Sequence, residues 1–362
     1  MTTNTEEKPE AASAGGKRSG RWTPKPQGRD IEAEITERLI GLMEAGTPPW
    51  QKPWSGGGGG MPLRHNGEPY SGINVLVLWS EAADKGHSSD HWMTFKQAQE
   101  YGGKVRKGEK STAIIHAGVF EKENAEGEKE RIPYKRTYAV FNASQIDGLP
   151  EKFHHRAPAV AASTERRADL DEYFAATGAK IEERGGQAAY FPIEDKITMP
   201  PIGNFTDTNR FYQVLSHEAV HWTGAGHRLD RGLGTRVKAD YAREELVAEI
   251  GSAFLMARHG IRPDFEQSAA YLKGWAAACR EDQKLIFKAA ADASKAIRFI
   301  NAAALDGGAK AAWKEEVFAA APAAAKDRQT PAKTVLTPEQ EQTRRAAMAQ
   351  RVAQRGRGAR AR

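Results

Sequence analysis

The stretch that most constrains this 362-residue chain is HEAVH at residues 217–221, two histidines four positions apart with a glutamate between them. Apolar residues recur three and four positions apart through residues 207–224, which predicts a helix. On a helix, side chains at positions i and i+4 lie on the same face. His217 and His221 could therefore bind one metal ion, and Glu218 could take a proton from a water molecule beside it. The pattern indicates a metal-dependent hydrolase.

A site of this kind needs a third protein ligand, and His227 is the first candidate. With His217, His221 and Gly224 it matches the spacing His-x-x-x-His-x-x-Gly-x-x-His, in which the glycine lets the chain turn back and bring the last histidine to the metal. That class of site also has a methionine turn below the metal. The nearby Met256 lies within a predicted helix, which argues against His227.

Glu245 is the second candidate, and we favour it over His227. Residues 242–255 have the apolar spacing of another helix, and Glu245 and Glu249 lie one turn apart on it. In this arrangement Glu245 binds the metal, and Glu249 accepts a hydrogen bond that fixes the tautomer of a histidine ligand. A further alternative is that Glu249 is itself the ligand.

The composition limits where such a site can work. The single cysteine, Cys279, excludes a disulfide framework and indicates a reducing compartment, which we expect to be the cytoplasm. The first ten residues have no apolar core for a signal peptide, and no apolar run reaches the roughly 18 residues of a membrane span. The net charge of +6 comes from residues 322–362, where ten basic residues face three acidic ones.

Changes in composition divide the chain into two domains with polar ends. The expected segments are a disordered arm at 1–28, a first domain at 29–150, a linker at 151–168, a second domain at 169–320 and a basic disordered tail at 321–362. The fold class is α+β, with a mixed α/β first domain and a mostly helical second domain.

The first domain mixes helical and strand patterns. Residues 30–46 have the spacing of an amphipathic helix, and a further helix is expected to begin at Ser71 or Asn74. Residues 112–120 and 135–141 alternate apolar and polar side chains, which predicts two strands.

Aromatic and basic side chains are interspersed through this domain. Aromatic rings that stack on bases, beside cations that follow the backbone, are what non-specific binding of single-stranded DNA requires. The residues expected to form such a site are Trp50, Lys52, Trp54, Trp92, Lys96, Lys104, Arg106, Lys107 and Lys110. Trp79, Tyr138 and Phe141 are instead expected in the core.

The second domain places short strands before the HEAVH helix. Residues 188–193 and 196–199 are predicted strands. In a zincin, the metallopeptidase class with the His-Glu-x-x-His motif, an edge strand at this point would pair with an extended peptide substrate. Residues 169–177 are a predicted helix, and residues 264–304 form an alanine-rich helical region broken near Glu281.

Several blocks of the sequence resemble the ArdC-type antirestriction proteins. In the first domain they are DIEAEITERLI (30–40), AGTPPWQKPW (45–54), YSGINVL (70–76), WMTFKQA (92–98), VRKGEK (105–110) and FNASQIDGLP (141–150). In the second domain they are HEAVHWTG (217–224), RLDR (228–231), YAREELVAE (241–249) and the helix with Trp275. The resemblance covers residues 29–302, and the arm, the glycine run 56–60 and the basic tail lie outside it.

The resemblance implies a single-stranded-DNA-binding N-terminal domain joined to a zincin-like metallopeptidase domain. A related N-terminal domain occurs in conjugative plasmid primases. The implied role is the protection of incoming plasmid DNA from host restriction.

The spacing and the resemblance together suggest one catalytic arrangement. Zn²⁺, or another divalent ion such as Mn²⁺, would be held by His217, His221 and Glu245. Glu218 would act as the base that activates water and then deliver the proton to the leaving amine. The developing oxyanion would be stabilised by Tyr241 or His227.

Two functional hypotheses remain open on the sequence. In the first, which we favour, the protein protects DNA by covering single strands, and residues 29–150 suffice for binding. In the second, it is an active zinc metalloprotease that cleaves a host protein, and DNA binding serves only for delivery. The expected partners are therefore single-stranded DNA and, in the second case, a protein substrate; no membrane partner is expected.

Overall fold

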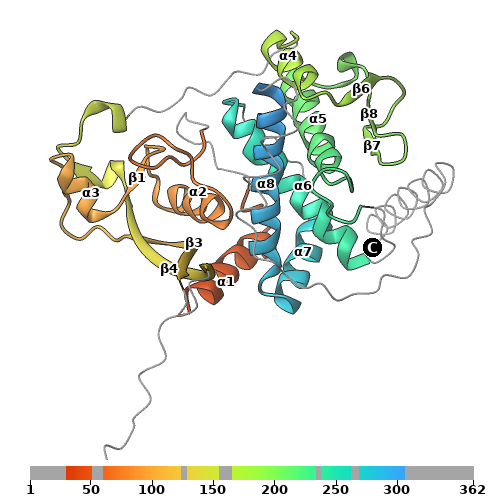
Figure 1. Ribbon diagram of the computed structural model, residues 1–362. Coiled ribbons are helices and arrows are strands. Elements are labelled where there is room, and N and C mark those ends of the chain that lie inside the picture. Colours follow the sequence, from red (N-terminus) through yellow and green to blue (C-terminus); the bar gives the residue numbers. More distant parts are fainter. Residues whose placement is uncertain are drawn as a thin grey trace, which may run out of the picture.

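The computed structural model describes residues 30–50, 60–123, 129–154, 165–233, 238–261 and 269–305. The expected arm at 1–28 and the basic tail at 321–362 lie outside this part of the chain. Figure 1 shows two units next to each other, one from the first half of the described sequence and one from the second. Both contain helices and strands, so the α+β class is confirmed, and the second unit is mostly helical as expected.

The first unit combines helices with two small sheets. Its α-helices are α1 (Ile31–Glu44), α2 (Ile73–Lys85) and α3 (Phe95–Glu100). An antiparallel sheet of order β1-β4-β3 contains β1 (Trp92–Met93), β3 (Thr112–Glu123) and β4 (Lys129–Asn142). The other sheet pairs β2 (Lys104–Val105) with β5 (Ile146–Asp147).

Local sequence signals account for the ends of the helices. Asp30 caps α1, because its Oδ1 accepts a hydrogen bond from Ala33 N at 3.1 Å. Gly46 follows the helix with a φ of +82°, a left-handed conformation that favours glycine. Thr94 and Gln97 form a capping box at the start of α3.

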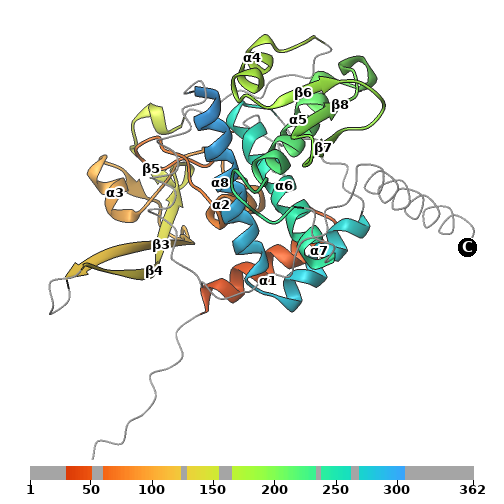
Figure 2. The same ribbon diagram turned by 45° about the vertical axis from the view of Figure 1, so that its right-hand side comes forward.

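Strands β3 and β4 form a two-stranded ribbon that is longer than the strands predicted at 112–120 and 135–141. The pairing runs from Thr112 opposite Val140 to Glu123 opposite Lys129. Most side chains of its outer part are exposed, so the apolar alternation that predicts a strand is lost there. The ribbon extends away from the helices (Figure 2).

The second unit contains a three-stranded sheet and the remaining α-helices. In the sheet order β6-β8-β7, β6 (Lys180–Glu183) is parallel to β8 (Lys196–Met199), and β7 (Ala189–Phe191) is antiparallel to it. The helices are α4 (Ala168–Ala176), α5 (Thr208–Thr223), α6 (Lys238–Arg258), α7 (Ala269–Glu281) and α8 (Leu285–Leu305). Short 3₁₀ helices are η1 (Ala143–Gln145) and η2 (Glu151–Phe153) in the first unit and η3 (Ile202–Asn204) in the second. Within the described residues, no helix is both long and apolar enough to cross a membrane.

The two units share one hydrophobic core, because α1 packs on α7 and α2 packs on α8. Trp50, which follows α1, meets Trp275 of α7 edge to face, with ring centroids 5.4 Å apart. Trp79 of α2 meets Phe254 of α6 in the same way at 5.6 Å. The hydrophobic core therefore continues across the point where the sequence divides into two units.

Polar contacts also cross between the units. Gly72 N, at the start of α2, donates a hydrogen bond to Ser294 Oγ of α8 at 2.7 Å. The Thr36 hydroxyl of α1 donates to the carbonyl of Gln283 at 3.2 Å. These bonds fix the first unit against α8 and the residues just before it.

The burial of the aromatic residues corrects part of the predicted DNA site. Trp50 is fully buried and Trp92 is 1% exposed, so neither ring is available to stack on a base. Trp50 is buried by a partner from the other unit, which the local sequence does not reveal. Tyr138, expected in the core, is instead 39% exposed on β4, whereas Trp79 is buried as expected.

Candidate metal centre

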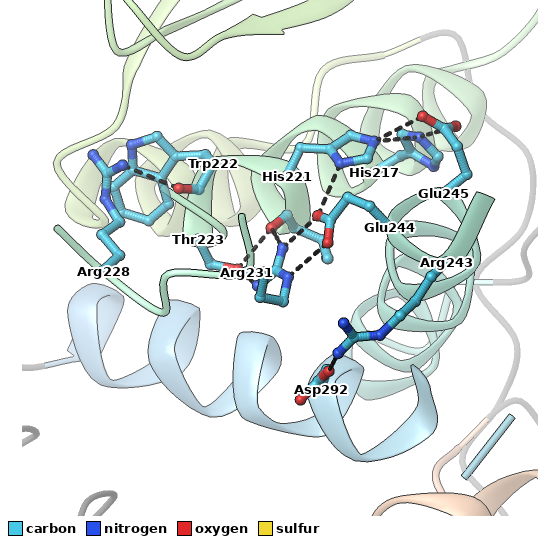
Figure 3. Close-up of polar contacts among 11 residues, drawn as sticks. His217, His221, Trp222, Thr223, Arg228, Arg231, Arg243, Glu244, Glu245 and Asp292 are labelled. Carbon is cyan, nitrogen blue, oxygen red and sulfur yellow. Dashed lines mark hydrogen bonds and ion pairs between the residues drawn. The ribbon is translucent and has the colours of Figure 1, made fainter. Parts of the chain in front are cut away.

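His217 and His221 project from α5 towards α6 (Figure 3). The helix begins after Asp207, whose Oδ1 accepts a hydrogen bond from Arg210 N at 3.0 Å, and ends at Gly224, as predicted. The Nε2 atoms of the two histidines are 3.1 Å apart. Two nitrogens bound tetrahedrally to one zinc ion lie about 3.3 Å apart, so this separation suits a shared cation.

Glu245 of α6 completes a three-residue cluster with the histidines. Its carboxylate oxygens lie 3.7 Å from His217 Nε2 and 3.6 Å from His221 Nε2. One ligand atom from each of the three residues lies within 4.8 Å of the others. Two imidazoles and a carboxylate are a donor set that fits zinc or another divalent transition metal.

His227 lies apart from this cluster. Its Nε2 is 3.3 Å from Asp195 Oδ2, and its side chain is 61% exposed. Met256 continues α6 as a buried helical residue and forms no turn. The geometry therefore favours Glu245 over His227 as the third ligand.

Each histidine has a carboxylate near its other ring nitrogen. Glu244 Oε1 lies 3.1 Å from His221 Nδ1, and Glu249 Oε1 lies 3.6 Å from His217 Nδ1. A carboxylate beside Nδ1 favours the tautomer with the proton there, which leaves Nε2 free to bind a metal. Glu249 thus lies where the sequence reasoning placed it, and Glu244 is a partner that this reasoning missed.

Arg231 holds Glu244 in place (Figure 3). Its guanidinium donates to both oxygens of the Glu244 carboxylate, at 2.7 and 2.9 Å, and also to Thr223 Oγ1 and Val220 O. The Arg231 side chain is 5% exposed, and a bidentate pair fixes the carboxylate in orientation. Burial alone would raise the pKa of Glu244, but the hydrogen bonds from Arg231 and His221 hold it below its usual value. The carboxylate beside His221 therefore stays ionised.

Gly224 makes room for Arg231. Its φ of −80° is open to any residue, so no left-handed turn requires a glycine here. A Cβ at this position would lie 2.8 Å from Arg231 Nη2 and 3.1 Å from the carbonyl oxygen of His221. The glycine therefore accommodates a buried guanidinium and does not turn the chain towards a ligand at His227.

Negative charge surrounds His217. Burial alone would lower the pKa of this imidazole, but a hydrogen bond with Glu245 and the charges of Glu249, Glu245 and Glu218 raise it to about 10. Burial alone would raise the pKa of the Glu245 carboxyl, but His217 and His221 lower it to about 2. The carboxylates thus favour positive charge at the point where the ligand atoms converge.

Glu218 lies against the small sheet. Its Oε2 accepts a hydrogen bond from Tyr190 N of β7 at 2.7 Å, and the side chain is 9% exposed. Within the described sheet β7 is an edge strand. The proposed base is therefore held at the edge where an extended peptide could add as a further strand.

Five of the cations predicted to contact DNA lie on the surface of the first unit. They are Lys96, Lys104, Arg106, Lys107 and Lys110. Arg106 also pairs with Glu109 at 2.7 Å. Lys52 and Trp54 lie outside the part of the chain that the structure describes.

Known protein families match both units. Residues 29–141 match the N-terminal domain of anti-restriction factor ArdC, and residues 168–292 match a zincin-like metallopeptidase. A metal-free crystal structure of the antirestriction ArdC protein from plasmid R388 is 48% identical, with a TM-score of 0.69. The match covers 77% of this chain and 99% of that one. This chain belongs to the ArdC antirestriction family.

Other relatives extend the family. An Mn(II)-bound structure of the R388 ArdC protein matches with 46% identity and a TM-score of 0.67, over 77% of this chain and 99% of that one. The uncharacterized protein y4eC of Sinorhizobium fredii is 33% identical, and the match covers 75% of this chain and 92% of the relative. A DNA primase TraC of Escherichia coli is 38% identical over 75% of this chain, but the match spans 27% of the primase's length. The ArdC architecture is thus shared with a segment of a much longer protein.

Proposed function

We propose that this protein binds single-stranded DNA and carries a divalent-metal site of the peptidase type, and that it protects incoming plasmid DNA from restriction in the cytoplasm. The convergence of His217, His221 and Glu245 within 4.8 Å supports the metal site most directly. Because the R388 relative has an Mn(II)-bound structure, Mn²⁺ and Zn²⁺ are the ions to test.

The steps of peptide hydrolysis can be assigned to a bound ion and to separate residues around the cluster. A bound ion would polarise a peptide carbonyl and lower the pKa of a water molecule. Glu218 would take the proton of that water and deliver it to the leaving amine. Its carboxylate is held beside the edge strand β7, where a peptide substrate would lie. For the oxyanion we favour Tyr241, which hydrogen-bonds Glu245, over His227, which pairs with Asp195.

DNA binding would belong to the first unit. The exposed cations Lys104, Arg106, Lys107 and Lys110 lie close together in the sequence around β2, where they could follow a phosphate backbone. Membership of the ArdC family supports an antirestriction role for this binding.

A protection assay tests the proposal. Plasmid DNA with single-stranded gaps is challenged with a purified restriction endonuclease, in the presence of the wild-type protein or Glu218→Gln. We expect both proteins to bind the DNA and to protect it equally, because protection by occupancy needs no hydrolysis. If neither protein binds or protects, the DNA-binding and antirestriction parts of the proposal fail.

An active metalloprotease that cleaves a host protein is the second candidate function. The contact of Glu218 with the edge strand β7 favours it, because that edge could hold an extended peptide beside the metal ligands. In the same assay this candidate predicts that only the wild-type protein protects the plasmid and that the endonuclease is cleaved.

Gly224→Ala should weaken metal binding about 10- to 100-fold, the usual effect of disturbing a residue that orients a metal ligand. The new methyl group would collide with Arg231, which cannot move without losing its bonds to Glu244, Thr223 and Val220. The measurement is calorimetric titration with Mn²⁺. Gly226→Ala is the matched control, because its Cβ would meet Asp230 Oδ1 at an ordinary 3.7 Å. Equal affinities of the two variants would exclude a positioning role for Arg231.

A further inference from the structure

Four aromatic rings form a row on one face of the β3–β4 ribbon, here named the aromatic stripe: Phe120, Tyr134, His116 and Tyr138. Gly118 is directly opposite Tyr134 in the strand register, so the even-numbered residues of both strands share this face. Successive ring centroids along the row are 6.1, 5.7 and 6.1 Å apart. The stripe is therefore continuous along the middle of the ribbon.

Gly118 and the neighbours of Tyr134 fix the central ring of the stripe. A Cβ at Gly118 would lie 2.8 Å from the Tyr134 ring, so this ring covers the position where a side chain would stand. The Tyr134 hydroxyl hydrogen-bonds His116 Nε2 at 3.0 Å. The Arg136 guanidinium lies 5.4 Å from the Tyr134 ring centroid. A ligand that binds here meets a surface that is already ordered.

The two rings at the ends of the stripe are exposed to solvent. Phe120 is 46% exposed and Tyr138 is 39% exposed. On the opposite face of the ribbon, Lys135 Nζ donates a hydrogen bond to Glu32 of α1 at 2.5 Å. At this position, therefore, α1 lies on the opposite face of the ribbon from the stripe. A continuous row of exposed aromatic rings marks an interaction surface.

We infer that the aromatic stripe is the surface on which bases of single-stranded DNA stack, an inference that rests on the proposed DNA binding. Bases in an unpaired strand offer free faces to aromatic rings, whereas the bases of a duplex already stack on one another. Cations that could contact the phosphates of such a strand are present near the stripe. Arg136 lies within it, and the exposed Lys107 and Lys110 come shortly before Thr112 in the sequence, where β3 begins. This charge favours a nucleic acid strand over a protein partner.

The test measures the affinity of the full chain for a fluorescein-labelled oligothymidylate by fluorescence anisotropy, across a series of salt concentrations. Phe120→Ala and Tyr138→Ala should each weaken binding about 5- to 100-fold, the usual effect of removing one stacking ring. The slope of log K against log salt should not change, because no phosphate contact is lost. Lys107→Ala should instead reduce that slope by about 0.7.

Matched controls separate the stripe from the rest of the DNA surface. Phe95 is 52% exposed on α3, so Phe95→Ala removes an equally exposed ring away from the ribbon and should bind like the wild type. Tyr138→Phe keeps the ring and should also keep the affinity. Both controls carry exposed substitutions, so loss of the fold is not expected to confuse the comparison.

Three outcomes overturn the inference in different ways. If the wild-type protein does not bind the oligothymidylate, the proposed DNA binding fails together with this site. If the wild type binds and the two alanine variants bind equally well, DNA binding stands and lies elsewhere. If the variants keep DNA binding but lose self-association in analytical ultracentrifugation, the stripe is a contact between copies of this chain.

Discussion

Glu218→Gln should lower the rate of peptide hydrolysis about 10²- to 10⁴-fold, the usual contribution of a general acid–base residue, while the protein keeps its fold and its metal. The amide cannot accept the proton of the attacking water. It can still accept the hydrogen bond from Tyr190 N, which Glu218 Oε2 accepts at 2.7 Å. Glu218→Ala would instead leave this buried backbone donor unpaired, and its effect would mix catalysis with stability.

The measurement is the hydrolysis of fluorescein-labelled denatured casein in the presence of Mn²⁺ or Zn²⁺. Glu172→Gln is the matched control, because it makes the same change at an exposed position on α4, outside the metal cluster. A Glu218→Gln protein that cleaves casein at the wild-type rate would exclude Glu218 as the base. A wild-type protein that cleaves no casein with either ion would count against general peptidase activity.

A fragment of residues 29–150 should fail to fold on its own. It would expose the face of α1 that packs on α7 and leave Trp50 and Trp79 without their partners Trp275 and Phe254. Exposing one large apolar side chain costs about 1.5–3 kcal/mol, so several of them amount to most of the roughly 5–15 kcal/mol that stabilises a domain. The expectation from sequence that these residues suffice for DNA binding is therefore replaced by the opposite prediction.

Urea unfolding followed by circular dichroism provides the measurement. Residues 29–305 serve as the control, because this longer fragment keeps every helix of the shared core. We expect one cooperative transition for the longer fragment and none for residues 29–150. A cooperative transition in the short fragment, with wild-type affinity for oligothymidylate, would show that the first unit is independent.

The metal cluster follows from the sequence because its geometry is set by local helix spacing. His217 and His221 lie one turn apart on one helix, and Glu245 and Glu249 lie one turn apart on another. A period of 3.6 residues is therefore enough to place each pair on one face. What the sequence does not specify is the side on which the two helices meet, and this decides between Glu245 and His227.

Partners that depend on tertiary contacts could not be predicted from the sequence. Arg231 bonds Glu244 from 13 residues away, outside any helix, and nothing in its spacing indicates a buried pair. Gly224, at the end of α5, leaves space for the Arg231 side chain. This reason for a glycine can be recognised only once the position of Arg231 is known. For a similar reason, Trp50 was expected at the DNA site but is buried, and Tyr138 was expected in the core but is exposed. Composition does not tell a buried ring from an exposed one.

Calorimetric titration of Mn²⁺ into the wild-type protein, Glu245→Gln and His227→Gln tests the proposed set of metal ligands. We expect one ion per chain, bound equally well by the wild type and His227→Gln. Glu245→Gln should bind the ion more than about 100-fold more weakly, because a direct ligand contributes more than the residues that orient it. If Glu245→Gln binds as tightly as the wild type, or if His227→Gln loses the ion, the ligand set proposed here is wrong.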